Sequence, residues 1–182
     1  QNADCGKWAW RGCLNHTAHT DGGIKAQTFR LCCFRSSCPV CSEQWARRST
    51  ARIMDRLTHS KKNLKHLKHV IVSPPTWLQQ KPIEELRKEA RKMAKRAGIQ
   101  GGLDIVHPFR KKGKEWYLSP HFHYLALGWV TKTDELFQKN GWLVKNIGIR
   151  DNPVGVVSYL LSHAGIKKRR HTVTWFGDLS YS

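Results

Sequence analysis

Apolar residues recur every three to four positions in four segments of the chain, which is the period of a helix with one buried face. The first of these segments opens at Glu43. In the other three, residues that favour helix starts precede the apolar pattern and a glycine follows it, as Pro82 and Gly98 do in the second. The expected helices run from residue 43 to about residue 57, over 81–98, over 131–141 with a Thr133 cap and a Gly141 stop, and over 151–165 with an Asn152 cap, Pro153 in the first turn and a Gly165 stop.

Shorter apolar runs lie between these segments and are bounded by glycine, proline and basic residues, as is typical of strands. Two of them, 101–109 and 116–128, are separated only by the basic stretch 110–114, which indicates a hairpin. Because strands and helices alternate along the chain and the strands come in hairpins, the pattern predicts an α+β fold, with a central antiparallel sheet and flanking helices. The other expected strands cover 66–75, 142–149 and 169–177.

Residues 1–42 lack a regular period and contain all six cysteines of the chain, between Cys5 and Cys41. Disulfide-linked folds spread their cysteines through the sequence, so this clustering favours a metal site in a reducing compartment. We therefore expect a zinc-binding module over 1–42 and a larger domain over 43–182, packed as one unit. The sequence opens with Gln1 rather than Met, and we expect it to be trimmed at one or both ends.

The cysteine spacing indicates a structural zinc site. Cys33, Cys38 and Cys41 form a C-x4-C-x2-C pattern, and the last two have the spacing of a zinc knuckle. We expect Cys13 as the fourth ligand and His16 next, because these two form a second pair at knuckle spacing. Four ligands saturate Zn²⁺, so we expect no catalysis there, and eight candidates are enough for two ions. The remaining candidates are Cys5, His19 and Cys32.

Basic residues outnumber acidic ones by 32 to 13, which gives a formal net charge of +19. Mixed charges would keep a protein equally soluble, so this excess predicts a polyanionic partner, and nucleic acid is the best candidate. No apolar run approaches 18 residues, so no membrane partner is expected.

Two kinds of side chain are candidates for contacting that nucleic acid. The basic run that directly follows the predicted helix 151–165 is the one most expected to reach DNA. It consists of Lys167, Lys168, Arg169 and Arg170. Tryptophans can stack on unpaired bases, and the candidates for this role are Trp77, Trp116 and Trp129.

The stretch SPHFHYLALG (119–128) places His121 and His123 on the same face of the expected strand, since alternate residues of a strand share a face. Neutral imidazole is the commonest protein ligand for divalent metals, and one ion would give both rings a partner. The alternative is a pair of hydrogen-bonded core histidines. The candidates for a third ligand are His163 and His107 equally, followed by Asp104.

Tyr159 and His163 lie four residues apart on a predicted helix and therefore share a face. This spacing would place a phenol oxygen near a metal-bound group. Tyrosine can act as a covalent nucleophile, and a metal ion can polarise a phosphoryl oxygen. Together with the positive charge, the pair predicts phosphoryl transfer on DNA.

Several stretches resemble, in order, the motifs of the HUH endonuclease superfamily. HVIVSPP (69–75) resembles its first motif strand, PHFHYL (120–125) its His-hydrophobic-His motif, and YLLSHAG (159–165) its nucleophile helix with a single tyrosine. The wider set CPVCSEQWA, HPFRKKGKEWYLSPHFHYLALGW and TWFGDLSY resembles the replication initiator proteins of archaeal rolling-circle plasmids and related viruses. The resemblance spans about residues 33–180.

This resemblance implies a five-stranded antiparallel sheet that carries the histidine pair, with the tyrosine helix packed nearby. It implies Mg²⁺ or Mn²⁺ bound by His121 and His123, with His163 or His107 completing the site. Tyr159 would attack single-stranded or melted origin DNA, leaving a 5′-phosphotyrosine link and a free 3′-OH that primes synthesis. A later reversal would rejoin the displaced strand.

The resemblance also implies partners and a location. It places the protein in the cytoplasm of an archaeal cell, and the basic charge indicates a host that is not salt-loving. The sequence has no G-x4-G-K-[ST] loop, so we expect an unwinding ATPase to be a partner or to lie outside this sequence. The expected partners are a host helicase and a host polymerase. A single candidate tyrosine argues against a termination scheme that uses two.

Two other functions are compatible with parts of the pattern. A single-tyrosine transposase or relaxase would use the same chemistry on a different DNA substrate. A non-enzymatic zinc-containing nucleic-acid-binding protein would have structural histidines. That protein would bind DNA in a salt-sensitive manner and would form no covalent adduct.

Overall fold

The computed structural model describes residues 3–13, 15–19, 21, 23, 25–60, 64–149, 152–164 and 171–180. The chain divides into two compact units, an N-terminal unit of residues 1–45 and a C-terminal unit of residues 46–182. Helix α1 (Ser42–Thr58) begins in the first unit and continues in the second.

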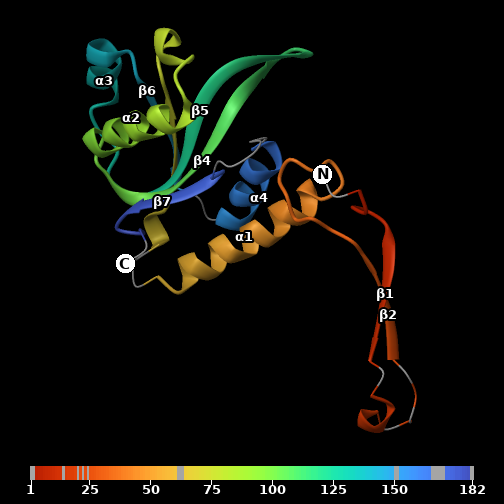
Figure 1. The fold of residues 1–182 in the computed structure, drawn as a ribbon. Helices are drawn as coiled ribbons and strands as arrows, with labels where there is room; N and C mark the ends of the chain where they lie inside the picture. The colour runs from red at the N-terminus through yellow and green to blue at the C-terminus, as the bar shows by residue number, and fades with distance from the viewer. Residues whose placement is uncertain are drawn as a thin grey trace. The chain divides into compact units, whose positions relative to one another are not determined.

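The N-terminal unit contains an antiparallel hairpin of β1 (Trp8–Cys13) and β2 (Lys25–Arg30), with the 3-10 turn η1 (His16–Ala18) between them (Figure 1). The sequence predicted no strand in this part of the chain. The physical reason is that nearly every side chain of both strands is exposed, so no buried face imposes an alternation of apolar and polar residues.

Within the described residues, the C-terminal unit holds four α-helices and a five-stranded antiparallel sheet in the order β6-β3-β5-β4-β7. The predicted α+β class and the antiparallel sheet are confirmed. The strands are β3 (Lys68–Ser73), β4 (Ile99–Lys112), β5 (Glu115–Gly128), β6 (Leu143–Ile149) and β7 (Val173–Gly177). Beyond α1, the helical elements are η2 (Leu64–His66), η3 (Thr76–Leu78), α2 (Ile83–Arg96), α3 (Thr133–Asn140) and α4 (Pro153–His163).

Helix ends follow the predicted signals in most places. The side-chain oxygen of Asn152 accepts a hydrogen bond of 3.0 Å from the backbone three residues on, which confirms the predicted cap of α4. Gly141 ends α3 with a φ of +68°, as a terminating glycine does. The Thr133 cap was wrong, because α3 begins at Thr133 itself and Lys132 occupies the cap position without a side-chain hydrogen bond. Gly165 lies outside the described residues.

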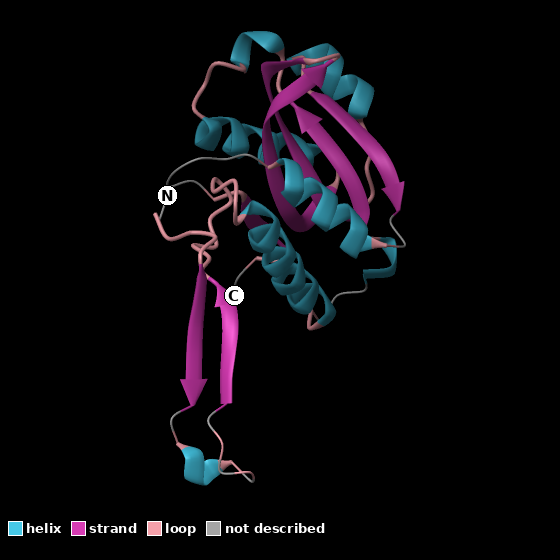
Figure 2. Ribbon diagram, turned by 90° about the vertical axis from the view of Figure 1, so that its right-hand side faces the viewer, coloured by secondary structure: helices cyan, strands magenta, loops and turns pink. Residues whose placement is uncertain are grey.

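The two faces of the sheet pack against different helices. Asp104 on β4 accepts a hydrogen bond of 2.7 Å from Arg91 of α2, so its face is the one covered by α2. His107, three residues further along β4, points to the opposite face, where its ring bonds the backbone carbonyl of Leu160 in α4. Figure 2 shows the strands of the sheet with helices packed along it. The core on the α2 face includes Val70, Val72, Leu86, Ala90, Val106, Phe122, Tyr124 and Phe176.

Strands β4 and β5 continue past the rest of the sheet as a two-stranded arm, residues 109–118, visible as the long green hairpin in Figure 1. A shift of register between His107 and Phe109 separates this β4–β5 arm from the sheet. Such bulges bend a strand and re-aim its side chains. The hairpin predicted from the sequence is confirmed, and its strands are longer than expected.

In the part of the chain that the structure describes, no helix combines the length and the apolar character that a membrane crossing requires.

Candidate functional site

Three buried histidines meet on the face of the sheet that α4 covers. His107 on β4 lies directly opposite His121 on β5, and His123 follows two residues later on the same face. The ring centroids are 5.4 Å apart for His107 and His121, 4.4 Å for His107 and His123, and 5.0 Å for His121 and His123. One nitrogen from each ring lies within 4.8 Å of the others, so this His triad has the geometry of a metal-binding group.

Backbone carbonyls set the tautomers of two triad rings. His107 Nε2 lies 2.8 Å from the carbonyl of Leu160, and His121 Nδ1 lies 2.8 Å from the carbonyl of Ser119. A carbonyl only accepts hydrogen bonds, so each of these nitrogens carries the proton. In a neutral ring the lone pair then sits on the other nitrogen, Nδ1 of His107 and Nε2 of His121. Metal-binding histidines are oriented in this way.

His123 is held by a fourth histidine. Its Nδ1 lies 2.9 Å from Nε2 of His69, a buried residue on the neighbouring strand β3. Its Nε2 is buried and has no hydrogen-bond partner. A buried nitrogen without a partner is costly, and a metal ion at the triad would satisfy it. This orphaned atom makes the three residues fit a bound cation better than a purely structural cluster.

Burial keeps the triad neutral and therefore able to bind a metal. It lowers the pKa of His107 and of His121 from 6.5 to about 4, and that of His123 to about 2. The charge of Arg110, on the β4–β5 arm, lowers the pKa of all three rings further. At neutral pH each imidazole therefore offers a lone pair.

Helix α4, which covers this triad, carries Tyr159. The carbonyl of Leu160, the next residue, accepts the hydrogen bond from His107, which ties this turn of α4 to the triad. The Tyr159 side chain is 64% exposed, and its ring lies 4.6 Å from that of His163, so the two share a helix face as predicted. The phenol is thus open to solvent.

The structure shows which of the three candidates for the third ligand joins His121 and His123. His107 belongs to the triad, whereas His163 is exposed and its Nδ1 lies 2.9 Å from the carbonyl of Tyr159. His163 is still close enough for its charge to lower the pKa of His107. Asp104 points to the opposite face, where it pairs with Arg87 and Arg91 of α2.

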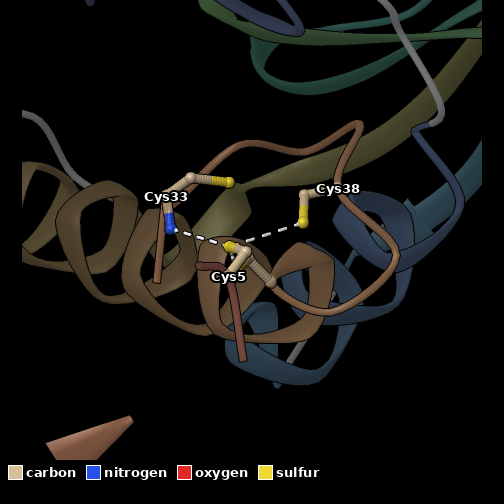
Figure 3. A group of neighbouring side chains, drawn as sticks. Cys5, Cys33 and Cys38 are labelled. Carbon is tan, nitrogen blue, oxygen red and sulfur yellow. Dashed lines mark hydrogen bonds between the residues drawn. The ribbon is translucent and has the colours of Figure 1, made fainter. Parts of the chain in front are cut away.

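The second group of ligands lies in the N-terminal unit. Cys5, Cys33, Cys38 and Cys41 form a cysteine cluster whose sulfurs all lie within 4.8 Å of one another. Figure 3 shows Cys5 Sγ between the backbone nitrogen of Cys33, at 3.2 Å, and Cys38 Sγ, at 3.7 Å. A tetrahedral zinc site with Zn–S bonds of about 2.3 Å requires sulfurs about 3.8 Å apart. The Cys5–Cys38 pair has this spacing, whereas the sulfurs of Cys5 and Cys41, 2.8 Å apart, would separate by about 1 Å around such an ion.

Hydrogen bonding within the cysteine cluster gives its thiols different pKa values. The Cys5–Cys41 contact, with sulfurs 2.8 Å apart, raises the pKa of Cys5 to about 12 and lowers that of Cys41 to about 6. Cys41 is therefore the first thiolate to form, and the thiols of Cys5, Cys32 and Cys38 hydrogen-bond to it. A bound cation would stabilise all four as thiolates.

The fourth sulfur is that of Cys5, where the sequence favoured Cys13. Cys13 lies exposed at the end of β1, opposite Lys25. Because a strand rises about 3.3 Å per residue, the hairpin carries Cys13 roughly 17 Å from its base at Trp8. At that base, the Gly6 N–H donates to Leu31 and brings Cys5 beside Cys33. Recognising the hairpin would have identified Cys5.

Two of the remaining zinc candidates, Cys32 and His19, lie outside the cysteine cluster. Cys32 is its immediate neighbour, and desolvation together with a hydrogen bond to Cys41 raises the pKa of its thiol. His19 is partly buried and belongs to neither of the two groups. The side chain of His16 lies outside what the structure describes.

The predicted DNA contacts are placed only in part. The basic run over 167–170 lies outside the described residues. Trp77, Trp116 and Trp129 are 71%, 61% and 76% exposed. Trp129 covers the ammonium group of Lys68 at 4.2 Å, and Trp116 lies on the β4–β5 arm.

No protein-family model matches the chain, and neither does any curated protein or solved structure.

Proposed function

We propose that this protein nicks and rejoins single-stranded DNA through a tyrosine-linked intermediate, as a rolling-circle replication initiator. The observation that carries the proposal is the meeting of three neutral, oriented imidazoles beside the helix turn that bears an exposed tyrosine. Neither feature alone would distinguish an enzyme from a structural core. Their connection through the Leu160 carbonyl joins a cation site to a nucleophile.

In the proposed reaction, the main task of the protein is to position the Tyr159 phenol and the phosphodiester that it attacks. The phenol oxygen of Tyr159 attacks the phosphorus of a phosphodiester, and the bond from phosphorus to the 3′-oxygen breaks. The phenol proton passes to solvent, since the side chain is exposed, and the departing 3′-oxygen takes up a proton to give a free 3′-OH. The 5′-phosphate stays on the tyrosine, and attack by a 3′-OH on this link reverses the reaction.

His107 and His121 would hold Mg²⁺ or Mn²⁺ through the nitrogens that their hydrogen bonds to carbonyls leave unprotonated, and His123 through its buried, unpartnered Nε2. When bound, such an ion would polarise a phosphoryl oxygen and offset the charge that develops on it. Three protein ligands leave positions open for a phosphate, as a catalytic site requires.

We assign Zn²⁺ to the cysteine cluster. Four thiolates close its coordination sphere, so the ion would stabilise the N-terminal unit and take no part in the reaction.

DNA as the substrate is supported by the net charge of +19. The role in rolling-circle initiation is supported by the order of the motifs HVIVSPP, PHFHYL and YLLSHAG. The same chemistry would serve a single-tyrosine transposase or relaxase.

The test is an adduct assay. Incubate the protein with a randomised single-stranded DNA library and Mn²⁺, denature it in SDS, and measure protein that migrates with attached DNA. The proposal predicts an adduct that Tyr159→Phe abolishes and that Tyr117→Phe, which removes the hydroxyl of another exposed tyrosine, retains. An adduct that survives Tyr159→Phe, or no adduct on the library and on hairpin DNA alike, would refute it.

A further inference from the structure

A groove of about 880 Å³ opens beside the His triad. Its walls come from the end of β3 and η3, from the β4–β5 arm and from α3. Two of its lining residues also belong to the surroundings of the triad: Ser119 accepts the hydrogen bond of His121, and the charge of Arg110 acts on all three rings. The groove and the triad are therefore neighbours.

Three aromatic side chains of the groove are open to solvent. Trp77 is 71% exposed, Phe137 is 56% exposed and Tyr117 is 46% exposed. Large exposed aromatics gathered in one concavity indicate a binding surface. They come from three separate segments, η3, α3 and the arm, so the fold and not one local sequence assembles them.

Trp77 is held in place by a glycine. Gly141 has a φ of +68°, and a Cβ added there would lie 2.6 Å from Cη2 of Trp77 and 3.0 Å from Cβ of Pro75. The indole therefore packs directly on the backbone of Gly141. An exposed ring with one supported edge is a preorganised stacking platform.

The charge of the groove is of one sign. Among its described lining residues the charged ones are Arg110 and Lys139, both basic. Arg110 is fixed by a hydrogen bond of 2.9 Å to the hydroxyl of Ser73, and Lys139 pairs with Glu135 on α3. The amide side chains on its lining, which can bond base edges, are Gln79, Gln138 and Asn140.

We propose that this groove binds one or two unpaired nucleotides of single-stranded DNA next to the phosphate at the His triad. Their bases stack on Trp77, Phe137 and Tyr117, and their phosphates contact Arg110 and Lys139. The adjacency to a reacting phosphate rests on the proposed function, whereas the binding itself does not. The groove would thus decide which nucleotides flank the nick.

The test compares two tryptophans that are almost equally exposed. Trp77 lines the groove, and Trp129 does not. Fluorescence anisotropy of a labelled 12-nucleotide single-stranded DNA pool is measured for wild type, Trp77→Ala, Trp77→Phe and Trp129→Ala. We expect Trp77→Ala to weaken binding roughly tenfold, Trp77→Phe to restore most of it, and Trp129→Ala to change it less than about twofold.

A second probe separates stacking from charge. An abasic pool of the same length has the phosphates and no bases, so wild type and Trp77→Ala should bind it equally. Lys139→Gln should instead lower the slope of log affinity against log salt by about 0.7. Circular dichroism and thermal unfolding verify that each variant is folded.

Equal binding of the base-containing pool by wild type and Trp77→Ala would overturn the groove proposal, whatever the adduct assay shows. Weaker binding by Trp77→Ala without any adduct from wild type would leave the groove as a DNA site and refute the nicking function. Equal affinity of wild type for duplex and single-stranded pools would also overturn the groove proposal, because stacked, paired bases cannot enter it.

Discussion

The cysteine cluster and the His triad both gather metal-ligand side chains, but they are built on different kinds of backbone. The cysteine cluster draws its sulfurs from loops and from the residue just before α1. The His triad is carried by two paired strands at the centre of the sheet. Loops can adjust around an ion, whereas a strand register fixes side chains before any ion arrives.

The two groups also differ in what they leave free. Four sulfurs complete a tetrahedron and exclude a further ligand, while three imidazoles leave positions for a substrate. Near the triad lie the helix turn that carries an exposed tyrosine, an arginine whose charge lowers the pKa of its rings, and a groove. The comparison supports the proposed division, in which an ion at the cysteine cluster would stabilise the N-terminal unit and an ion at the His triad would take part in the reaction.

Cys41→Ser should have the largest structural effect. Cys41 is buried and is the sulfur whose pKa its neighbours lower most, so its loss leaves three thiols without their central thiolate. We expect bound zinc to fall from about one ion per chain to almost none, measured by inductively coupled plasma mass spectrometry. Cys13→Ser is the matched control and should retain zinc, because Cys13 is exposed and outside the cluster. Zinc loss in both variants would contradict the assignment.

His121→Asn should have the largest effect on chemistry. It removes one of the three rings and should lower the yield of DNA adduct by roughly two to three orders of magnitude, while bound zinc is unchanged. The matched control is His59→Asn, an exposed histidine on the turn after α1. Adduct yield that depends on Cys41 more steeply than on His121, in folded protein, would reverse the roles of the two clusters.

His69→Leu should have a smaller effect on the same reaction. His69 does not belong to the triad, but its Nε2 holds Nδ1 of His123 at 2.9 Å. Removing a hydrogen bond behind a ligand typically costs 10- to 100-fold in metal affinity or activity. We expect a Mn²⁺ requirement raised by about tenfold in a titration of adduct yield, and partial recovery in His69→Gln. Unchanged Mn²⁺ dependence in His69→Leu would show that His123 needs no such support.

The smallest effect that we expect is a change in how the stability of the fold depends on pH. In the absence of added divalent metal, the unfolded chain protonates its histidines near pH 6.5, whereas burial lowers the pKa of His107 to about 4 in the fold. The stability gained from neutral triad rings is therefore present above pH 6.5 and is lost as the pH falls towards 4. We expect the melting temperature to drop between pH 7 and pH 5, and to drop less in His121→Gln. Equal drops would contradict the burial of the triad.

The sequence predicts strands and helices well where one face is buried, and poorly elsewhere. The pairing of His121 with His123 followed from the two-residue period of β5 alone. The choice of His107 over His163 needed the register of β4 on β5, which depends on contacts between strands. His69 was overlooked because its partner lies 54 residues away on another strand.

The strands of the N-terminal unit could not be predicted from the sequence for a related reason. Its hairpin has no buried face, so nothing in the hydrophobic pattern marks the strands. Without the hairpin, sequence spacing favours Cys13, whereas the fold selects Cys5. Local spacing is a reliable guide within the knuckle of Cys38 and Cys41, and it fails once a strand intervenes.

The most direct test of the central claim is to locate the covalent bond. Adduct formed with Mn²⁺ is trimmed by nuclease and digested with trypsin, and the peptides are sequenced by tandem mass spectrometry. We expect a nucleotide phosphate attached to Tyr159, at a level that falls with His121→Asn and is retained in Cys13→Ser. A nucleotide on any other residue, or on none in protein that binds DNA tightly, would contradict it.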